Sequence, residues 1–417
     1  MTTIDRAAVL GPQTLARLAD WLAVGVAVSL PWSTSAAGIF VVLWLVAALP
    51  TLNVAAVRRE LLTPAGGLPV LLWALAVVGM LWADVTWKER LAGLDSFHRL
   101  LFVPVLLAHF RRSANGIWVL YGFFASVVGV LLASWVLALT PGLSWRGKQF
   151  GIPVKDYVLQ SEDFLLCAIV ALERGFAAHR ARQRRSMPVF FALALLFLAN
   201  VTFIALGRTT LLVAPVLFLM LGWRLYGLKG AVGAIVLGCV VGASVWFESP
   251  YLRDRMDRSV AEFEAYRTSD ALNSTGMHLE FLRKSLTFIA VAPVIGHGTG
   301  SIPEQFRGTV SADAGSASVA SVNPHNQIFA VAIQLGLAGA LILVAMWIAH
   351  LMLFRGGSFI DWIGLIVVVQ NVVSSLVNSH LFDFTQGWIY IFGVGVAGGM
   401  VLRQRDLAQA AVLAAKP

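Results

Sequence analysis

Long apolar runs, separated by short polar connections, fill the chain from about residue 18 to residue 403. A helix that crosses a bilayer needs about 20 mostly apolar residues. Only helices and closed barrels leave no backbone polar group unpaired in lipid, and runs of this length indicate helices. The pattern therefore predicts an all-α polytopic membrane protein with about twelve transmembrane helices. The predicted spans are 18–34, 36–53, 67–84, 96–110, 115–140, 157–178, 187–206, 209–226, 229–247, 326–353, 358–378 and 385–403.

One large polar loop, residues 248–325, separates the ninth and tenth predicted spans. Loops longer than about 12–15 residues are usually functional or disordered. Within it, a charged stretch through Arg267 can form one helix, and residues 274–289 carry apolar positions three and four apart, typical of an amphipathic helix in the membrane interface. We expect residues 296–300 to form a flexible turn, because three of the five are glycine.

These patterns divide the chain into four regions. They are 1–247 (transmembrane helices 1–9), 248–325 (the loop with its interfacial helices), 326–403 (transmembrane helices 10–12) and 404–417 (a cytoplasmic tail). Nothing near the first residues is typical of a cleaved signal peptide, since Gly11-Pro12 interrupts a short apolar run.

The composition excludes an ordinary soluble protein. Of 417 residues, 58% are hydrophobic and 13% are charged, whereas soluble domains are about 45–50% apolar and about 25% charged. The net charge of +9 could suggest a nucleic-acid ligand. However, the basic residues follow the alternation of the spans, so we predict membrane lipids as the surroundings and no nucleic-acid partner.

Basic residues gather in alternate connections. Together with the two termini, one set of connections holds more than half of the 31 basic residues: Arg58-Arg59, Arg111-Arg112, the arginines of 174–185, Arg224 with Lys229, and Arg355. By the positive-inside rule these connections and both termini are cytoplasmic. The opposite side nevertheless keeps basic residues near 141–156, at Arg208 and in 248–325. An anionic ligand on that side would explain them.

The loop ends in Asn323-Pro324-His325-Asn326, directly before an apolar run. A residue before proline is extended, so the helix should begin near 325–326, where free N–H groups favour an anion. Two interpretations stay open. Asn323 caps the helix and His325 is an ordinary interfacial residue, or His325 is a base or hydrogen-bond donor at a reaction centre.

Arg208 stands between two apolar spans with almost no loop. It could simply extend its guanidinium into the interface. Alternatively, a charge this close to the membrane has a function, and the planar guanidinium suits a diphosphate.

Two further groups of cations leave a similar choice. The groups are Arg146, Lys148 and Lys155, and then Arg253, Arg255 and Arg258. Each lies near two carboxylates that it could neutralise, Glu162 with Asp163 and Asp254 with Asp257. In the other interpretation, each supplies part of an anion site.

The sequence shows no sign of a bound metal or cofactor. It lacks a P-loop, a dinucleotide fingerprint, an HExxH motif and an Asp-x-Asp pair. We therefore predict no metal, with cationic side chains neutralising any phosphate. Cys167 and Cys239 lie in apolar runs, which favours small core residues over a disulfide.

Over about 200–345 the chain resembles the O-antigen ligase and polymerase superfamily. The resemblance rests on the order of four motifs: Gly207-Arg208-Thr209, the arginine-containing helix at 274–286, the Pro-x-x-Gly turn of 292–300, and Pro324-His325-Asn326 followed by Gly336 and Gly339. One departure is His278, where many members carry arginine. That leaves the arginine's role open between Arg283 and the 253–258 cluster.

The resemblance implies an inner-membrane glycosyltransferase of GT-C-like architecture with a periplasmic active site. It would transfer polysaccharide from undecaprenyl diphosphate to a sugar hydroxyl of lipid A-core, inverting the anomeric carbon without a metal. His325 and Arg208 would be catalytic. The other expected diphosphate or substrate contacts are Arg146, Lys155, Arg255, Arg258, His278, Arg283 and Asn326. A polymerase with the same chemistry and a transporter of lipid-linked glycans are the alternatives. The late position of the loop and the basic end of the sixth span favour the ligase.

Overall fold

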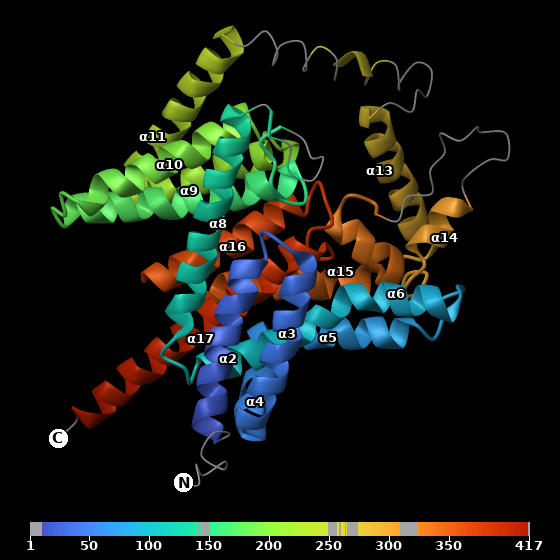
Figure 1. Cartoon of the computed structure of the whole chain (residues 1–417). Coiled ribbons are helices and arrows are strands. Elements are labelled where there is room, and N and C mark those ends of the chain that lie inside the picture. The colour runs from blue at the N-terminus through green and yellow to red at the C-terminus, as the bar shows by residue number, and fades with distance from the viewer. Residues whose placement is uncertain are drawn as a thin grey trace.

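The computed structural model describes residues 11–140, 142–143, 145, 150–248, 257, 260–262, 264, 274–308 and 323–415, and all of their regular structure is helical (Figure 1). The predicted all-α class is confirmed. The elements are α2 (Pro12–Ser29), α3 (Thr34–Ala48), η1 (Leu49–Thr51), α4 (Val54–Leu61), α5 (Pro64–Gly79), α6 (Trp87–His98), η2 (Arg99–Leu101), α7 (Phe102–Phe110), α8 (Gly116–Leu139), α9 (Tyr157–Arg180), α10 (Ser186–Phe203), α11 (Arg208–Glu248), α13 (Ser274–Val291), α14 (Ile302–Arg307), α15 (Gln327–Leu353), α16 (Phe359–Ser374) and α17 (Phe384–Ala414).

Among the described residues, seven helices are long and apolar enough to cross a membrane, or eight if the bent pair α4–α5 is one span. Every predicted span contains a helix, but some fall short of that criterion. Helices α5 and α16 have 16 residues each, α2 has a polar start, and α9 carries several charged residues. The count of twelve stays a prediction.

Helix α11 covers the eighth and ninth predicted spans. Tyr226 and Gly227 leave helical geometry, and Gly227 has a φ of +60°. A Cβ added to Gly222 would lie 2.4 Å from the carbonyl oxygen of Gly230. Residues eight apart in a straight helix cannot touch, so the chain reverses here, as two successive spans require.

The region predicted as the connection 84–95 is instead mostly the helix α6. Thr86 and Glu89 form a capping box at its start, each side chain hydrogen-bonding the other residue's backbone N–H. The fourth predicted span therefore begins earlier than expected, and α6, η2 and α7 together form an apolar segment from Trp87 to Phe110.

The turn predicted to be flexible, residues 296–300, is held firmly, so that prediction is wrong. Helix α15 is broken at Gly336, whose φ is +63°, and the break exposes backbone groups that pair with the turn. His297 N–H donates to Ile333 O at 2.9 Å, Gly298 N–H to Gln334 O at 2.8 Å, and Leu337 N–H to Pro293 O at 2.7 Å. We call residues 293–300 with 333–338 the glycine junction.

The glycine junction requires its glycines. A Cβ at Gly336 would lie 2.2 Å from Val294 O, and one at Gly300 would lie 2.2 Å from Glu89 O. Both residues also have positive φ, which side chains disfavour. The junction therefore fixes the start of α15 against α6 and the end of α13.

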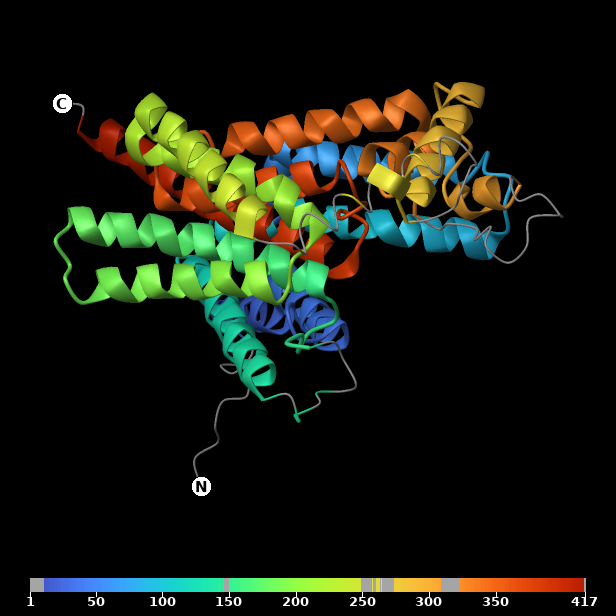
Figure 2. The ribbon, with the colours of Figure 1, turned by 90° about the horizontal axis from the view of Figure 1, so that it is seen from above.

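The connections separate into two ends of the molecule. At one end, Arg111 contacts Glu60 and Asp406, and Arg224 contacts Glu173. Figure 2 shows the α9–α10 connection and the C-terminus toward this end, with α13 and α14 at the other. That these two ends correspond to the two predicted sides of the membrane stays a prediction.

Candidate functional site

His325 lies where the end of the loop meets the α16–α17 connection, residues 375–383. Its φ is +52°, a left-handed backbone that is uncommon outside glycine and that concentrates at functional sites. Its N–H donates to Asn323 Oδ1 at 2.9 Å, and its ring Nδ1 lies 3.2 Å from Asn378 Oδ1. Its ring stacks on Phe281 of α13, with centroids 5.8 Å apart. Contacts from three segments hold the strained residue in place.

These contacts assign the hydrogen on the imidazole. The Asn378 oxygen accepts, so Nδ1 carries the hydrogen and donates it. An imidazole whose orientation is fixed through one ring nitrogen is suited to acid–base chemistry through the other.

The cap of α15 is Asn326, not Asn323, so that part of the capping interpretation is wrong. Asn326 Oδ1 accepts from Phe329 N–H at 3.1 Å, and its Nδ2 donates to Leu376 O at 2.9 Å. Asn323 instead accepts from His325, as above. A contact of Asn326 with substrate stays a prediction beside this structural role.

Arg208 is the exposed first residue of α11, beside the start of α9. Thr210 Oγ1 and Ser161 Oγ are 2.7 Å apart, and a Cβ on Gly207 would lie 2.6 Å from Ser161 Oγ. The N-termini of α9 and α11 therefore lie side by side. Both place the positive end of a helix dipole near Arg208, the first residue of α11, although at α9 the Asp156 side chain caps Leu159 N–H.

The start of α9 also adjoins the α16–α17 connection. His380 Nε2 lies 3.3 Å from Glu162 Oε1, without hydrogen-bond geometry, and His380 Nδ1 lies 3.5 Å from Asp383 Oδ2. Burial lowers the pKa of His380 to about 4, helped by the nearby charge of His325. Burial raises the pKa of Asp383, an effect that the charges of Lys155 and Arg99 oppose. The charges of both Lys155 and His325 therefore act on Asp383.

A polar cavity of about 370 Å³ opens beside Asn323 and Pro324. Helix α6, the glycine junction, α14, α15 and the α16–α17 connection all contribute to it. Its polar lining side chains are Glu89, Ser96, Asn323, Gln334, Ser379 and Asp383. Arg307 of α14 forms an ion pair with Glu89 at its edge. Hydroxyl, amide and carboxylate groups are the usual partners of sugar hydroxyls, and the two carboxylates disfavour a phosphate.

Arg99 is a site residue that the sequence interpretation did not select. Its side chain is buried, and its Nη1 donates to the carbonyl oxygens of Leu381 and Asp383. It thereby holds the connection that carries Asn378, His380 and Asp383. The sequence did carry a signal for Arg99, because it is a charged residue at the start of an apolar run. A charge in such a place is energetically unfavourable unless it has polar partners.

The remaining predicted residues are less central in the structure. Arg283 is on α13 and contacts Glu280, with Nε 3.0 Å from Oε2. His278 lies in α13, but its side chain is outside the described part of the chain, as are Arg146, Arg255 and Arg258. The predicted helix at residues 274–289 is confirmed as α13, which ends at Val291, two residues before Pro293.

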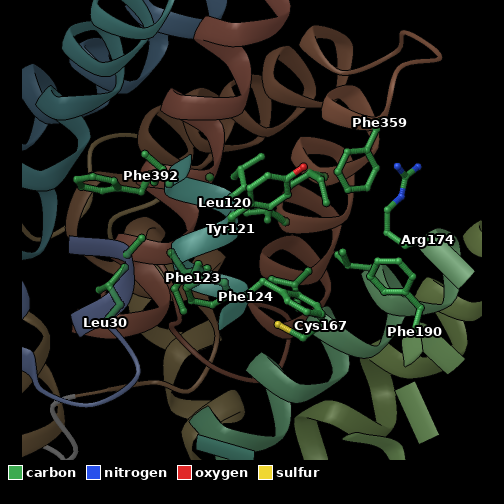
Figure 3. Close-up of a pocket in the computed structure, with 18 residues that line it drawn as sticks. Leu30, Leu120, Tyr121, Phe123, Phe124, Cys167, Arg174, Phe190, Phe359 and Phe392 are labelled. Carbon is green, nitrogen blue, oxygen red and sulfur yellow. The ribbon is translucent and has the colours of Figure 1, made fainter. Parts of the chain in front are cut away.

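An apolar cavity of about 410 Å³ lies among α2, α8, α9, α10, α16 and α17 (Figure 3). Aromatic side chains such as Phe123, Phe124 and Phe190 line it, and the Arg174 guanidinium stands 3.8 Å over the Phe359 ring at one end. Cys167 is buried in its wall, as expected for a core residue, but Cys239 is exposed on α11, so its predicted core position is wrong. Both cysteines are free.

Residues 193–344 match a family model described as O-antigen ligase. The matched segment runs from α10 through α13 and α14 into α15, so it includes Arg208, the glycine junction and His325. It leaves out the start of α9 and the α16–α17 connection, which complete the site in space. A comparison with curated proteins gives no match. The match covers about a third of the chain, and for this segment, which holds both predicted catalytic residues, the predicted resemblance to the O-antigen ligase superfamily is confirmed.

Proposed function

We propose that the protein is a ligase that transfers polysaccharide from undecaprenyl diphosphate to a sugar hydroxyl of lipid A-core, at the periplasmic face of the bacterial inner membrane. The observation that carries the proposal is the strained His325, whose ring is held by Asn378 and Phe281 next to Pro324 at the polar cavity. The family match over residues 193–344 supports the reaction class.

In the proposed reaction, the acceptor hydroxyl oxygen attacks the anomeric carbon of the donor sugar. The bond between that carbon and the diphosphate oxygen breaks, and its electron pair leaves with the diphosphate. His325 Nε2 takes the hydroxyl proton. Because attack is opposite to the leaving group, the anomeric centre inverts.

Negative charge grows on the diphosphate as the bond breaks. Arg208, with Lys155 and the N-termini of α9 and α11, provides positive potential on that face. The attraction between a cation and the diphosphate grows as negative charge develops on the leaving oxygen. Such a cation therefore stabilises the transition state more than the ground state. We assign the acceptor sugar to the polar cavity beside Pro324, because its hydroxyl, amide and carboxylate side chains suit sugar hydroxyls.

The test is the acceptor assay. Purified protein receives a lipid-linked glycan together with either lipid A-core or a second lipid-linked repeat. We expect glycosylated lipid A-core. Longer glycans on the lipid carrier alone would identify a polymerase, and lipid movement across a vesicle without any new glycosidic bond would identify a transporter.

We further propose that the chemical step uses no metal, since cationic side chains neutralise the diphosphate. Transfer should continue in excess EDTA at a temperature where the protein stays folded. Loss of transfer by folded protein, restored by Mg²⁺, would contradict this part of the proposal.

A further inference from the structure

A second polar site lies inside the helix bundle, behind the candidate functional site. A small cavity of about 20 Å³ lies between α9, α16 and α17. Its polar lining residues are Glu162, Asp163, Gln370, Asn371, Ser374, Gln386 and Tyr390. A site needs about 10–15 Å³ to hold one water molecule, so the cavity has room for one water or one ion.

The oxygens around this cavity lack partners. Glu162 Oε1, Asp163 Oδ1, Gln370 Oε1 and Asn371 Oδ1 are all buried without a hydrogen bond. The residues that carry them are only 2, 3, 7 and 6% exposed, respectively. Unpaired buried oxygens are costly, and several around one small space are rare in folded proteins.

The charge around the cavity is also uncompensated. Within the described residues, no lysine or arginine lies within ion-pair distance of Glu162 or Asp163, and His380 is the only partner near Glu162. The expected ion pair between these acids and Lys155 therefore does not form. Helix α16 ends at Ser374, so the negative end of its dipole points to the same region.

From this geometry we propose that the cavity is a binding site for a hard divalent cation, with Ca²⁺ the best match. Two carboxylates balance its charge. Carboxylate and amide oxygens are the ligands that Ca²⁺ prefers, and its coordination tolerates irregular geometry, whereas Mg²⁺ demands a near-ideal octahedron. The bound ion would join α9 to α16 beneath the α16–α17 connection. This role concerns stability and does not depend on the proposed transferase activity.

The first test uses the purified protein in detergent. After dialysis against trace Ca²⁺, elemental analysis should find about one calcium per chain. Thermal unfolding should shift upward by several degrees between excess EGTA and millimolar Ca²⁺, because a ligand that binds only the folded state stabilises it. Tb³⁺, a luminescent substitute for Ca²⁺, should show emission sensitised by Tyr390, and Ca²⁺ should displace it.

Variants make the assignment specific. Asp163→Asn and Gln370→Leu should each abolish the Ca²⁺-dependent rise in Tm, whereas Asp95→Asn, which changes an exposed acid on α6, should keep it. Absence of bound divalent metal in the wild type, with no Tb³⁺ emission, would overturn the proposal. A Tm that responds to Na⁺ but not to Ca²⁺ would also overturn it, as would an Asp163→Asn variant that is more stable than wild type in Ca²⁺.

Discussion

Buried carboxylates have different surroundings at the two ends of this molecule. At the end predicted to be cytoplasmic, Glu60 is fully buried and contacts both Arg59 and Arg111. At the other end, Glu162 and Asp163 are just as buried, but no arginine or lysine among the described residues pairs with them. At the first end, arginine partners therefore balance the charge of Glu60. The acids without such a partner at the second end indicate that a group from outside the protein chain, such as the proposed cation, binds there.

The largest difference expected between the two ends is in their reactivity with a reagent that cannot cross the membrane. In a Cys239→Ser background, Glu304→Cys on α14 should react with a membrane-impermeant maleimide in intact spheroplasts. Gln183→Cys in the α9–α10 connection should react only after the membrane is permeabilised. Both positions are exposed, so the difference depends on sidedness alone. The reverse pattern would invert the predicted topology.

His325→Ala should have the largest effect on activity. Loss of a general base costs about 10²–10⁴-fold in rate, which would remove long-chain lipopolysaccharide from a strain that lacks its own ligase. His179→Ala, at an exposed histidine of the other end, is the matched control and should behave as wild type. Normal lipopolysaccharide ladders from the His325 variant, at equal protein level, would exclude this residue from the mechanism.

Arg208→Ala should reduce turnover by about 100-fold, the usual cost of losing one group that stabilises transition-state charge. Arg208→Lys should recover only part of the rate, because lysine keeps the charge but lacks the planar fork. The measurement is in vitro transfer with lipid A-core as acceptor. Arg58→Ala, an exposed arginine of the other end, serves as control. Equal rates for the two alanine variants would show that Arg208 has only an interfacial role.

Arg111→Met should have the smallest effect on activity but a clear one on stability. It leaves the carboxylate of Glu60 buried with one partner fewer, and breaking a buried ion pair costs about 3 kcal/mol. Arg112→Met is the control, since that guanidinium makes one exposed bond to Thr51 O and should cost below about 1 kcal/mol. Reversible unfolding in mixed detergents measures both. Similar losses for the two variants would show that pairing does not stabilise this end.

The sequence predicted much of the fold because membrane helices have a local signal. The positions of the apolar runs identified the helices, including the reversal near Gly227 and the amphipathic helix before Pro293. Boundaries were less accurate where polar residues continue a helix, as in α6, whose capping box at Thr86 extends it toward the loop.

The candidate site was only partly predictable. His325 and Arg208 stood out because each is a polar residue at the edge of an apolar run. The partners that shape their surroundings, Asn378, His380 and Arg99, come from other helices. No local sequence pattern indicates that those residues lie near His325. Likewise, none indicates that Gly296 packs against the backbone of Gln334.

The sequence by itself determined that this is a helical membrane protein with cations at two ends and a histidine at the start of a late span. These properties depend on hydrophobicity and charge within windows of about 20 residues. Only the tertiary structure decided which charges are paired, which backbone groups the glycine junction satisfies, and which oxygens face a cavity without partners. Those outcomes depend on contacts between segments far apart in the chain, where packing rather than local periodicity selects the neighbour.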